Sequence, residues 1–218
     1  MKTLTQYIYE DFKISKRVKT HKYHPTTIET LEQLVQQRFR NAKTDYVDLN
    51  DIDVSDVESF NNLFGGVFNT TDKTIDMSRW NMSNTKNVSN MFQACGAKQI
   101  ILPAKQWGEN LKSLSAMFFH CVHLEQIINL EKLHCPDVEN IEFFLGDCEQ
   151  LKSIDLSNCK MKNIKHASWA FQNCKSLEHF NIEGNKFNIK DKTYCDNTFF
   201  DVKNEFIPIW YKNFHDLL

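Results

Sequence analysis

The segment AFQNCKSLEHFNI, residues 170–182, recurs along the chain at a nearly constant interval. Its core is a large apolar residue followed three positions later by cysteine, and weaker copies without the cysteine flank the clear ones. The large residues of the successive copies lie 26 to 29 residues apart and are Phe64, Phe92, Phe118, Leu145, Phe171 and Phe200. A period of this length over that many copies predicts a solenoid, in which coils stack along one axis.

Short strands are predicted a fixed distance before these repeat positions. Alternating apolar pairs such as Val47 and Leu49 would point inward, so that the residues between them face outward. Strand and repeat position are 17 residues apart in the first, second and fifth coils. In the third and fourth coils that spacing leads to Ile101 and Ile128. Their neighbours Ile100, Leu102 and Ile127 are also apolar, so the register is ambiguous: either strand could instead contain one extra residue.

The ends of the chain depart from the repeat. Residues 1–24 are predicted to form an arm and 25–44 a capping helix, in which Thr26 and Glu29 have the spacing of a capping box. The solenoid would occupy residues 45–203, and the apolar stretch 204–218 would form a C-terminal cap. Together these features predict an α/β solenoid of about six coils.

Composition restricts the classes of partner. A formal charge of -2 and a pI near 6.4 argue against nucleic acid, which favours clustered Lys and Arg. No apolar run approaches the roughly 18 residues of a membrane span, so no membrane is expected. The first residues, MKTLTQYIYEDFKISKR, carry acids where a signal peptide has an apolar core, which predicts a cytoplasmic protein.

Four cysteines, Cys95, Cys121, Cys148 and Cys174, share one position of the repeat. Stacked coils would place them about 4.8 Å apart, within reach of a disulfide. Small buried thiols are nevertheless the favoured interpretation for a chain in a reducing compartment.

Motifs for catalysis are absent from the sequence. It contains no nucleophile elbow, phosphate loop or zinc spacing. The nearest metal candidate is His120 and His123 around Cys121, beside Cys95 and Cys148, but the cysteines should point inward while the histidines need not converge on them. We therefore predict no catalytic residue, no metal and no cofactor.

The outer face of the predicted sheet is the candidate binding surface. Acidic residues and asparagines at equivalent positions indicate either a stripe that binds a basic surface or cation, or short polar side chains suited to turns and solvation. The candidate residues are Tyr46, Asp48, Asp76, Asn129, Asp155, His179 and Asn181.

The pattern AFxxCxxLxxIxI, as in residues 170–182 and 144–156, resembles the BspA-type leucine-rich repeat. LNDIDVSDVESFNNLF, from Leu49 to Phe64, and IDMSRWNMSNTKNVSNMF, from Ile75 to Phe92, are similar to its Asn- and Ser-rich bacterial subgroup. This resemblance implies a right-handed leucine-rich-repeat solenoid. KTLTQYIYEDFKI and HPTTIETLEQLV, near the N-terminus, are similar to the leader of short repeat proteins encoded by phages and mobile elements.

The function expected from these features is a non-enzymatic module that binds an unidentified protein through its sheet face. A phage origin would make a host protein the target. Two alternatives remain open: a structural or self-assembling component, and a surface adhesin exported without a recognisable signal.

Overall fold

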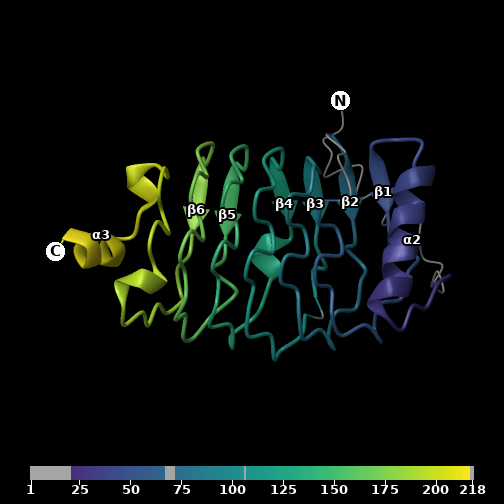
Figure 1. Cartoon of the computed structure of the whole chain (residues 1–218), viewed down its shortest axis with the longest axis horizontal. Coiled ribbons are helices and arrows are strands. Elements are labelled where there is room, and N and C mark those ends of the chain that lie inside the picture. The colour runs from purple at the N-terminus through teal and green to yellow at the C-terminus, as the bar shows by residue number, and fades with distance from the viewer. Residues whose placement is uncertain (1–20, 67–71, 106, 217–218) are drawn as a thin grey trace.

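Parallel strands stacked along one axis form a solenoid of about five turns (Figure 1). The computed structural model describes residues 21–66, 72–105 and 107–216. Each strand has three residues, and β1 to β4 form one sheet while β5 and β6 form a second. The strands are β1 (Tyr46–Asp48), β2 (Thr74–Asp76), β3 (Gln99–Ile101), β4 (Gln126–Ile128), β5 (Ser153–Asp155) and β6 (His179–Asn181).

The register of β3 and β4 resolves the alternative that the sequence left open. Ile75 pairs with Ile100, and Ile100 pairs with Ile127, so these three residues occupy the same inward position. Ile100 and Leu102 are fully buried. The third and fourth coils therefore contain one extra residue between strand and repeat position, and Ile101 and Ile128 lie on the outward side. The 3₁₀ helix η1 (Leu130–Lys132) follows β4, where the sheet is interrupted.

The large residues of the repeat form the centre of the core. Phe64, Phe92, Phe118, Leu145 and Phe171 are fully buried. Around each of them the backbone donates to the next coil, as in Phe92 N to Met117 O at 2.8 Å and Phe118 N to Phe144 O at 2.9 Å. We call these segments the knob turns, residues 62–66, 90–94, 116–120, 143–147, 169–173 and 197–201. Each knob turn begins and ends with a residue of positive φ.

Phe199, rather than Phe200, occupies the repeat position of the last knob turn, so the prediction for Phe200 was wrong. Phe171 N donates to Thr198 O, which places Phe199 directly after the acceptor, as Phe118 follows Met117 in its coil. Phe199 is buried and stacks on Phe171 with ring centroids 5.5 Å apart, whereas Phe200 is 59% exposed. Two adjacent phenylalanines made the choice ambiguous in the sequence.

Helix α2 (Ile28–Asn41) packs on the first coil. It buries Leu31, Val35 and Phe39, and the Phe39 ring lies 6.4 Å from that of Phe64. The helix begins one residue later than the predicted capping box implies, because the Thr27 side chain accepts a hydrogen bond from Thr30 N. Most of the predicted arm lies outside the described residues; its last part pairs with the solenoid through a parallel bridge between Tyr23 and Ile52.

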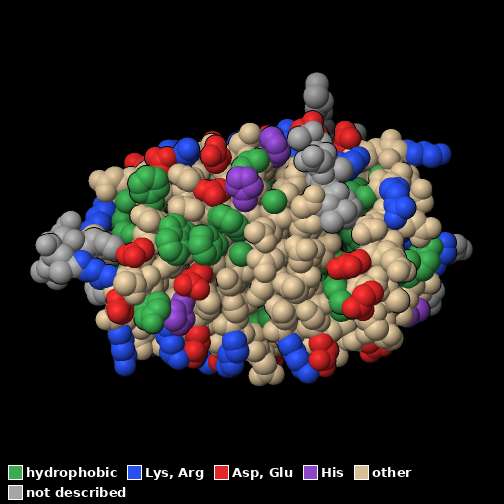
Figure 2. Space-filling view, in the orientation of Figure 1, with side chains coloured by type: hydrophobic (Ala, Val, Ile, Leu, Met, Phe, Trp, Pro, Cys, Tyr) green, Lys and Arg blue, Asp and Glu red, His purple; other side chains and the backbone are tan. Residues whose placement is uncertain are grey.

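The opposite end of the solenoid carries the 3₁₀ helices η2 (Lys192–Tyr194) and η3 (Asn204–Phe206) and helix α3 (Ile209–Asp216). Trp210 packs on Phe187 with centroids 4.5 Å apart, and Tyr211 packs on Phe199 at 4.8 Å. Hydrophobic side chains gather on the half of the visible face that is nearer α3 (Figure 2). Within the described part of the chain, none of the helices has the length and apolar character needed to cross a bilayer.

Candidate binding surfaces

We define the sheet face by two rows of outward side chains. Parallel pairing in register aligns residues of adjacent strands about 4.8 Å apart within β1 to β4 and within β5 and β6, and the rows list the equivalent positions of both sheets. The first row contains Tyr46, Thr74, Gln99, Gln126, Ser153 and His179. The second row contains Asp48, Asp76, Ile101, Ile128, Asp155 and Asn181.

The middle of the second row is apolar. Ile101 is paired with Ile128, and the adjacent Asp76 is paired with Ile101. Ile101 is buried, with an exposed fraction of 7%, and Ile128 is partly exposed. Polar Gln99 and Gln126 lie beside them in the first row and are joined by a side-chain hydrogen bond of 2.8 Å. The partly exposed Ile128 is therefore an apolar position within a polar surround, with the buried Ile101 beside it.

Asn129, predicted to face outward from a strand, lies just beyond β4. It has a left-handed backbone with φ of 67°, and its amide donates to Leu102 O at 2.8 Å. This hydrogen bond joins two neighbouring coils, so Asn129 stabilises the stacking of the solenoid. Because of the extra residue in this coil, Ile128 takes the outward position that the sequence assigned to Asn129.

The short polar residues of the second row close turns at the ends of their strands. Asp48, Asp76 and Asp155 each accept a hydrogen bond of 2.9 Å from the backbone N–H two residues later. Asn181 does the same with Glu183 at 3.1 Å. This local bond is a turn-forming role of Asp and Asn, which accounts for their recurrence without a ligand.

Asp155 remains ionised at neutral pH. Partial burial raises its pKa, but hydrogen bonds from Ser157 and the charge of nearby His179 outweigh burial and lower the pKa overall. The His179 ring nitrogen lies 4.0 Å from the carboxylate. The two residues thus form a polar pair at the β5–β6 end of the sheet face.

Asp76 was predicted to face solvent, and this was wrong. Its side chain is only 8% exposed, because the hydroxyl of Tyr46 in the preceding coil donates to one carboxylate oxygen while Ser78 N donates to the other. Burial and the hydrogen bond to Asp76 both raise the pKa of Tyr46. Tyr46 itself is 48% exposed. The first two coils are therefore joined by a polar contact on the sheet face.

Comparison with known protein families gives two overlapping matches, to residues 6–108 and 95–210, from a single family. It is described as "Mycoplasma protein of unknown function, DUF285". The chain belongs to this DUF285 family. No curated protein and no solved structure matches the chain. Two successive matches to one family model agree with the repeated coils of this DUF285 member.

A metal centre at the histidines around Cys121 is not formed. His120 points toward Asp147, with 3.7 Å between ring nitrogen and carboxylate oxygen, while the Cys121 thiol is buried and donates to Phe92 O at 2.9 Å. Throughout residues 21–66, 72–105 and 107–216, no group of three or more His, Cys, Asp or Glu side chains is arranged to hold a metal.

The cysteine column consists of free, buried thiols. Cys121, Cys148 and Cys174 each donate to a carbonyl of the preceding coil, over 2.9 to 3.3 Å. Burial raises the pKa of Cys95 and of Cys148, and it raises that of Cys174 to about 12. The position thus serves packing and a weak hydrogen bond between coils.

We expect the folded chain to resist a thiol reagent such as iodoacetamide at pH 7.5, whereas all seven cysteines should react after unfolding in urea. Because the folded pKa values are raised above the ordinary value of about 8.5, the thiols' contribution to stability is complete below that pH and declines above it. Urea midpoints should therefore fall between pH 8 and pH 10. Rapid labelling of the folded chain would contradict this account.

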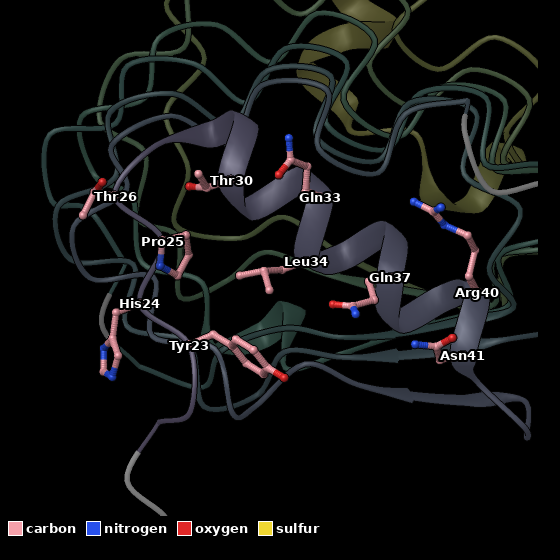
Figure 3. Close-up of a pocket in the computed structure, with 10 residues that line it drawn as sticks. All are labelled: Tyr23, His24, Pro25, Thr26, Thr30, Gln33, Leu34, Gln37, Arg40 and Asn41. Carbon is pink, nitrogen blue, oxygen red and sulfur yellow. The ribbon is translucent and has the colours of Figure 1, made fainter.

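A groove of about 710 Å³ lies between residues 23–26 and the outer side of α2 (Figure 3). Tyr23 and Leu34 line its middle, and the rest of its wall is mostly uncharged amide and hydroxyl side chains, with Arg40 at one end (Figure 3). No carboxylate or thiol lines it. His24 also lines the groove, and its ring nitrogen lies 3.4 Å from the carboxylate of Asp53.

Proposed function

We propose that this chain is a non-enzymatic module that binds a protein partner through the sheet face. The observation that carries the proposal is the partly exposed Ile128, with the buried Ile101 beside it, at positions where the flanking strands have Asp or Asn. An apolar centre within a polar surround is the usual anatomy of a protein interface. The strands that present it are fixed by backbone pairing, which favours binding without rearrangement.

The proposal includes a finer description of the architecture. We infer a right-handed leucine-rich-repeat solenoid of the BspA type with six coils, supported by the six knob turns with their paired left-handed residues. We also infer that α2 and α3 cap its two ends. The buried stripe of α2 and the contacts of Trp210 and Tyr211 support this role, since an uncovered coil would expose its apolar interior.

The cellular setting belongs to the same proposal. Buried cysteines that form no disulfide, such as the four of the cysteine column, favour a reducing compartment, so we place the protein in the cytoplasm. The likeness of the N-terminal segments to phage-encoded repeat proteins is the support for a phage or mobile-element origin. In that case the partner is a protein of the bacterial host.

An affinity capture with a single-residue variant tests the sheet face. Ile128→Asn introduces the residue that β6 carries at the same outward position, Asn181, so the fold should be retained. Ile209→Asn makes the same chemical change at a 76% exposed position of α3 and is the matched control. We expect wild type and Ile209→Asn to retain one protein from lysate of the native cells, and Ile128→Asn to recover at least about tenfold less.

Equal recovery by the three chains would contradict binding through the sheet face. If each chain recovered only further copies of itself, the self-assembling alternative would replace the proposal. Mass spectrometry of the retained proteins and a melting curve for each variant provide these readouts.

A further inference from the structure

Three partly exposed aromatic side chains form a continuous row across neighbouring knob turns. The ring centroids of Phe119 and Phe143 are 5.0 Å apart, and those of Phe143 and Trp169 are 4.9 Å apart with an angle of 7° between the planes. We call Phe119, Phe143 and Trp169 the aromatic row. It lies in the half of the chain nearer α3.

The backbone at two of these residues is strained. Phe143 and Trp169 both have a φ of 56°, a left-handed conformation that is unfavourable for bulky residues. The equivalent first positions of three other knob turns are Asn62, Asn90 and Asn197, and asparagine adopts this conformation most readily among non-glycine residues. The coil therefore does not require an aromatic residue there.

Gly146 provides the space in which the row packs. A Cβ atom at this position would lie 2.7 Å from Trp169 O and 3.3 Å from a ring carbon of Phe119. The core beneath is filled by other residues, since Phe144, Leu145 and Phe171 are fully buried. Strain and a glycine are thus both used to hold rings at the surface, a pattern that occurs at functional sites.

Acidic residues occur in and next to the knob turns of the row. Glu142 directly precedes Phe143, and Asp147 ends the same knob turn. In the knob turn beyond Trp169, Asp196 supplies the carbonyl that accepts from Trp169 N at 2.9 Å, and Asp201 ends the turn. Asp147 is near His120, and Asp201 is near Lys175. Four acids thus belong to the knob turns of the row and the adjoining knob turn, or directly precede a residue of these turns, and two of them are paired with His120 and Lys175.

We propose that the aromatic row binds a basic segment of a protein, with an arginine side chain lying against the faces of Phe143 and Trp169. Guanidinium groups stack on aromatic rings and pair with carboxylates, so the rings and the acids of the same and adjoining knob turns select the same partner. Aromatic residues on a rigid surface are typical anchors of protein interfaces. This surface is separate from the sheet face, and the inference does not depend on the function proposed above.

A defined peptide tests the proposal. The probe is a fluorescent 12-residue peptide of alternating arginine and glycine, with a control peptide in which citrulline, uncharged but of similar shape, replaces each arginine. At about 0.15 M salt, where exposed charges are screened beyond roughly 8 Å, we expect wild type to bind the arginine peptide at least tenfold more tightly than the citrulline peptide. No binding of the arginine peptide, or equal binding of both, overturns the proposal.

Two pairs of substitutions separate the row from general acidity. Phe143→Asn with Trp169→Asn introduces the asparagine of the other knob turns and leaves the net charge unchanged; we expect at least tenfold weaker binding and an unchanged melting temperature. Glu142→Gln with Asp196→Asn keeps both rings, and we expect several-fold weaker binding. Ile209→Asn is the matched control and should bind as wild type does.

Retention of wild-type affinity by either pair contradicts the proposal. If the asparagine pair fails to fold, the rings are required for stability, and the pair Glu142→Gln with Asp196→Asn decides the question. Loss of binding in Ile209→Asn would also contradict it, because the peptide would then not be bound at the row.

Discussion

Phe92→Ala is expected to lower the free energy of unfolding by about 3–5 kcal/mol, the range for a buried aromatic replaced by alanine. The Phe92 ring is stacked between Phe64, at 4.8 Å, and Phe118, at 5.1 Å, with interplanar angles of 4° and 1°. Backbone hydrogen bonds from Phe64 and Phe92 to the following coils fix the spacing of these turns. The coils cannot close around the cavity, so little of the lost packing is recovered.

Urea unfolding followed by circular dichroism measures this effect, and Phe200→Ala is its matched control. Phe200 is 59% exposed in the last knob turn, so its loss should change stability by less than about 1 kcal/mol. Similar losses in the two variants would mean that the core does not depend on the stacked column. A large loss of stability in Phe200→Ala alone would mean that Phe200, and not Phe199, occupies the repeat position.

Asp76→Lys is expected to lower the free energy of unfolding by about 2–5 kcal/mol, because two hydrogen bonds to the carboxylate of Asp76 are lost and a hydrogen bond to a charged group contributes about 1.5–3 kcal/mol. The donors of these bonds are the Tyr46 hydroxyl and the backbone N–H of Ser78. Lysine has no acceptor atom to replace the carboxylate and brings a positive charge into a site that is only 8% exposed.

Asp48→Lys is the matched control for this change. Asp48 has the same place in its strand and the same turn hydrogen bond, to Asn50 N at 2.9 Å, but it is exposed. Its loss should lower stability by about 1 kcal/mol, the contribution of one ordinary hydrogen bond. Equal effects at the two positions, measured as urea midpoints, would show that the burial of Asp76 does not stabilise the fold.

The solenoid could be predicted from the sequence because its period is carried by large core residues. A small residue at these positions would leave a cavity and a polar one would be buried in the core, so the spacing stays visible as Phe64, Phe92, Phe118 and Phe171. The strands before them are predicted by alternation alone. That signal fails at Ile100, Ile101 and Leu102, where three consecutive apolar residues fit either register.

Contacts between coils determine the strand register and the repeat position that the alternation of apolar residues left ambiguous. Ile100 takes the inward position because it pairs with Ile75 and Ile127. Phe199 is chosen over Phe200 by the backbone bond from Phe171, a contact between residues far apart in the chain. Neither contact has a local signature in the sequence.

The sheet face was predicted in outline, but two of its residues were misplaced. Asp76 is buried by Tyr46 from the preceding coil, and no pattern within either coil indicates that contact. Asn129 moved out of the strand because its coil has an extra residue. The aromatic row was missed because its left-handed positions carry Phe and Trp, whereas Gly or Asn would have marked them.

Site-specific photo-crosslinking in native cells tests the central proposal, binding through the sheet face, most directly. A photoreactive amino acid would be placed at the exposed outward position of Gln126 in β4, and at Ile209 in α3 as the control. The account predicts that position 126 crosslinks to one protein other than this chain and that position 209 does not. Crosslinks at position 126 only to a second copy of the chain, or the same partner at both positions, would contradict it.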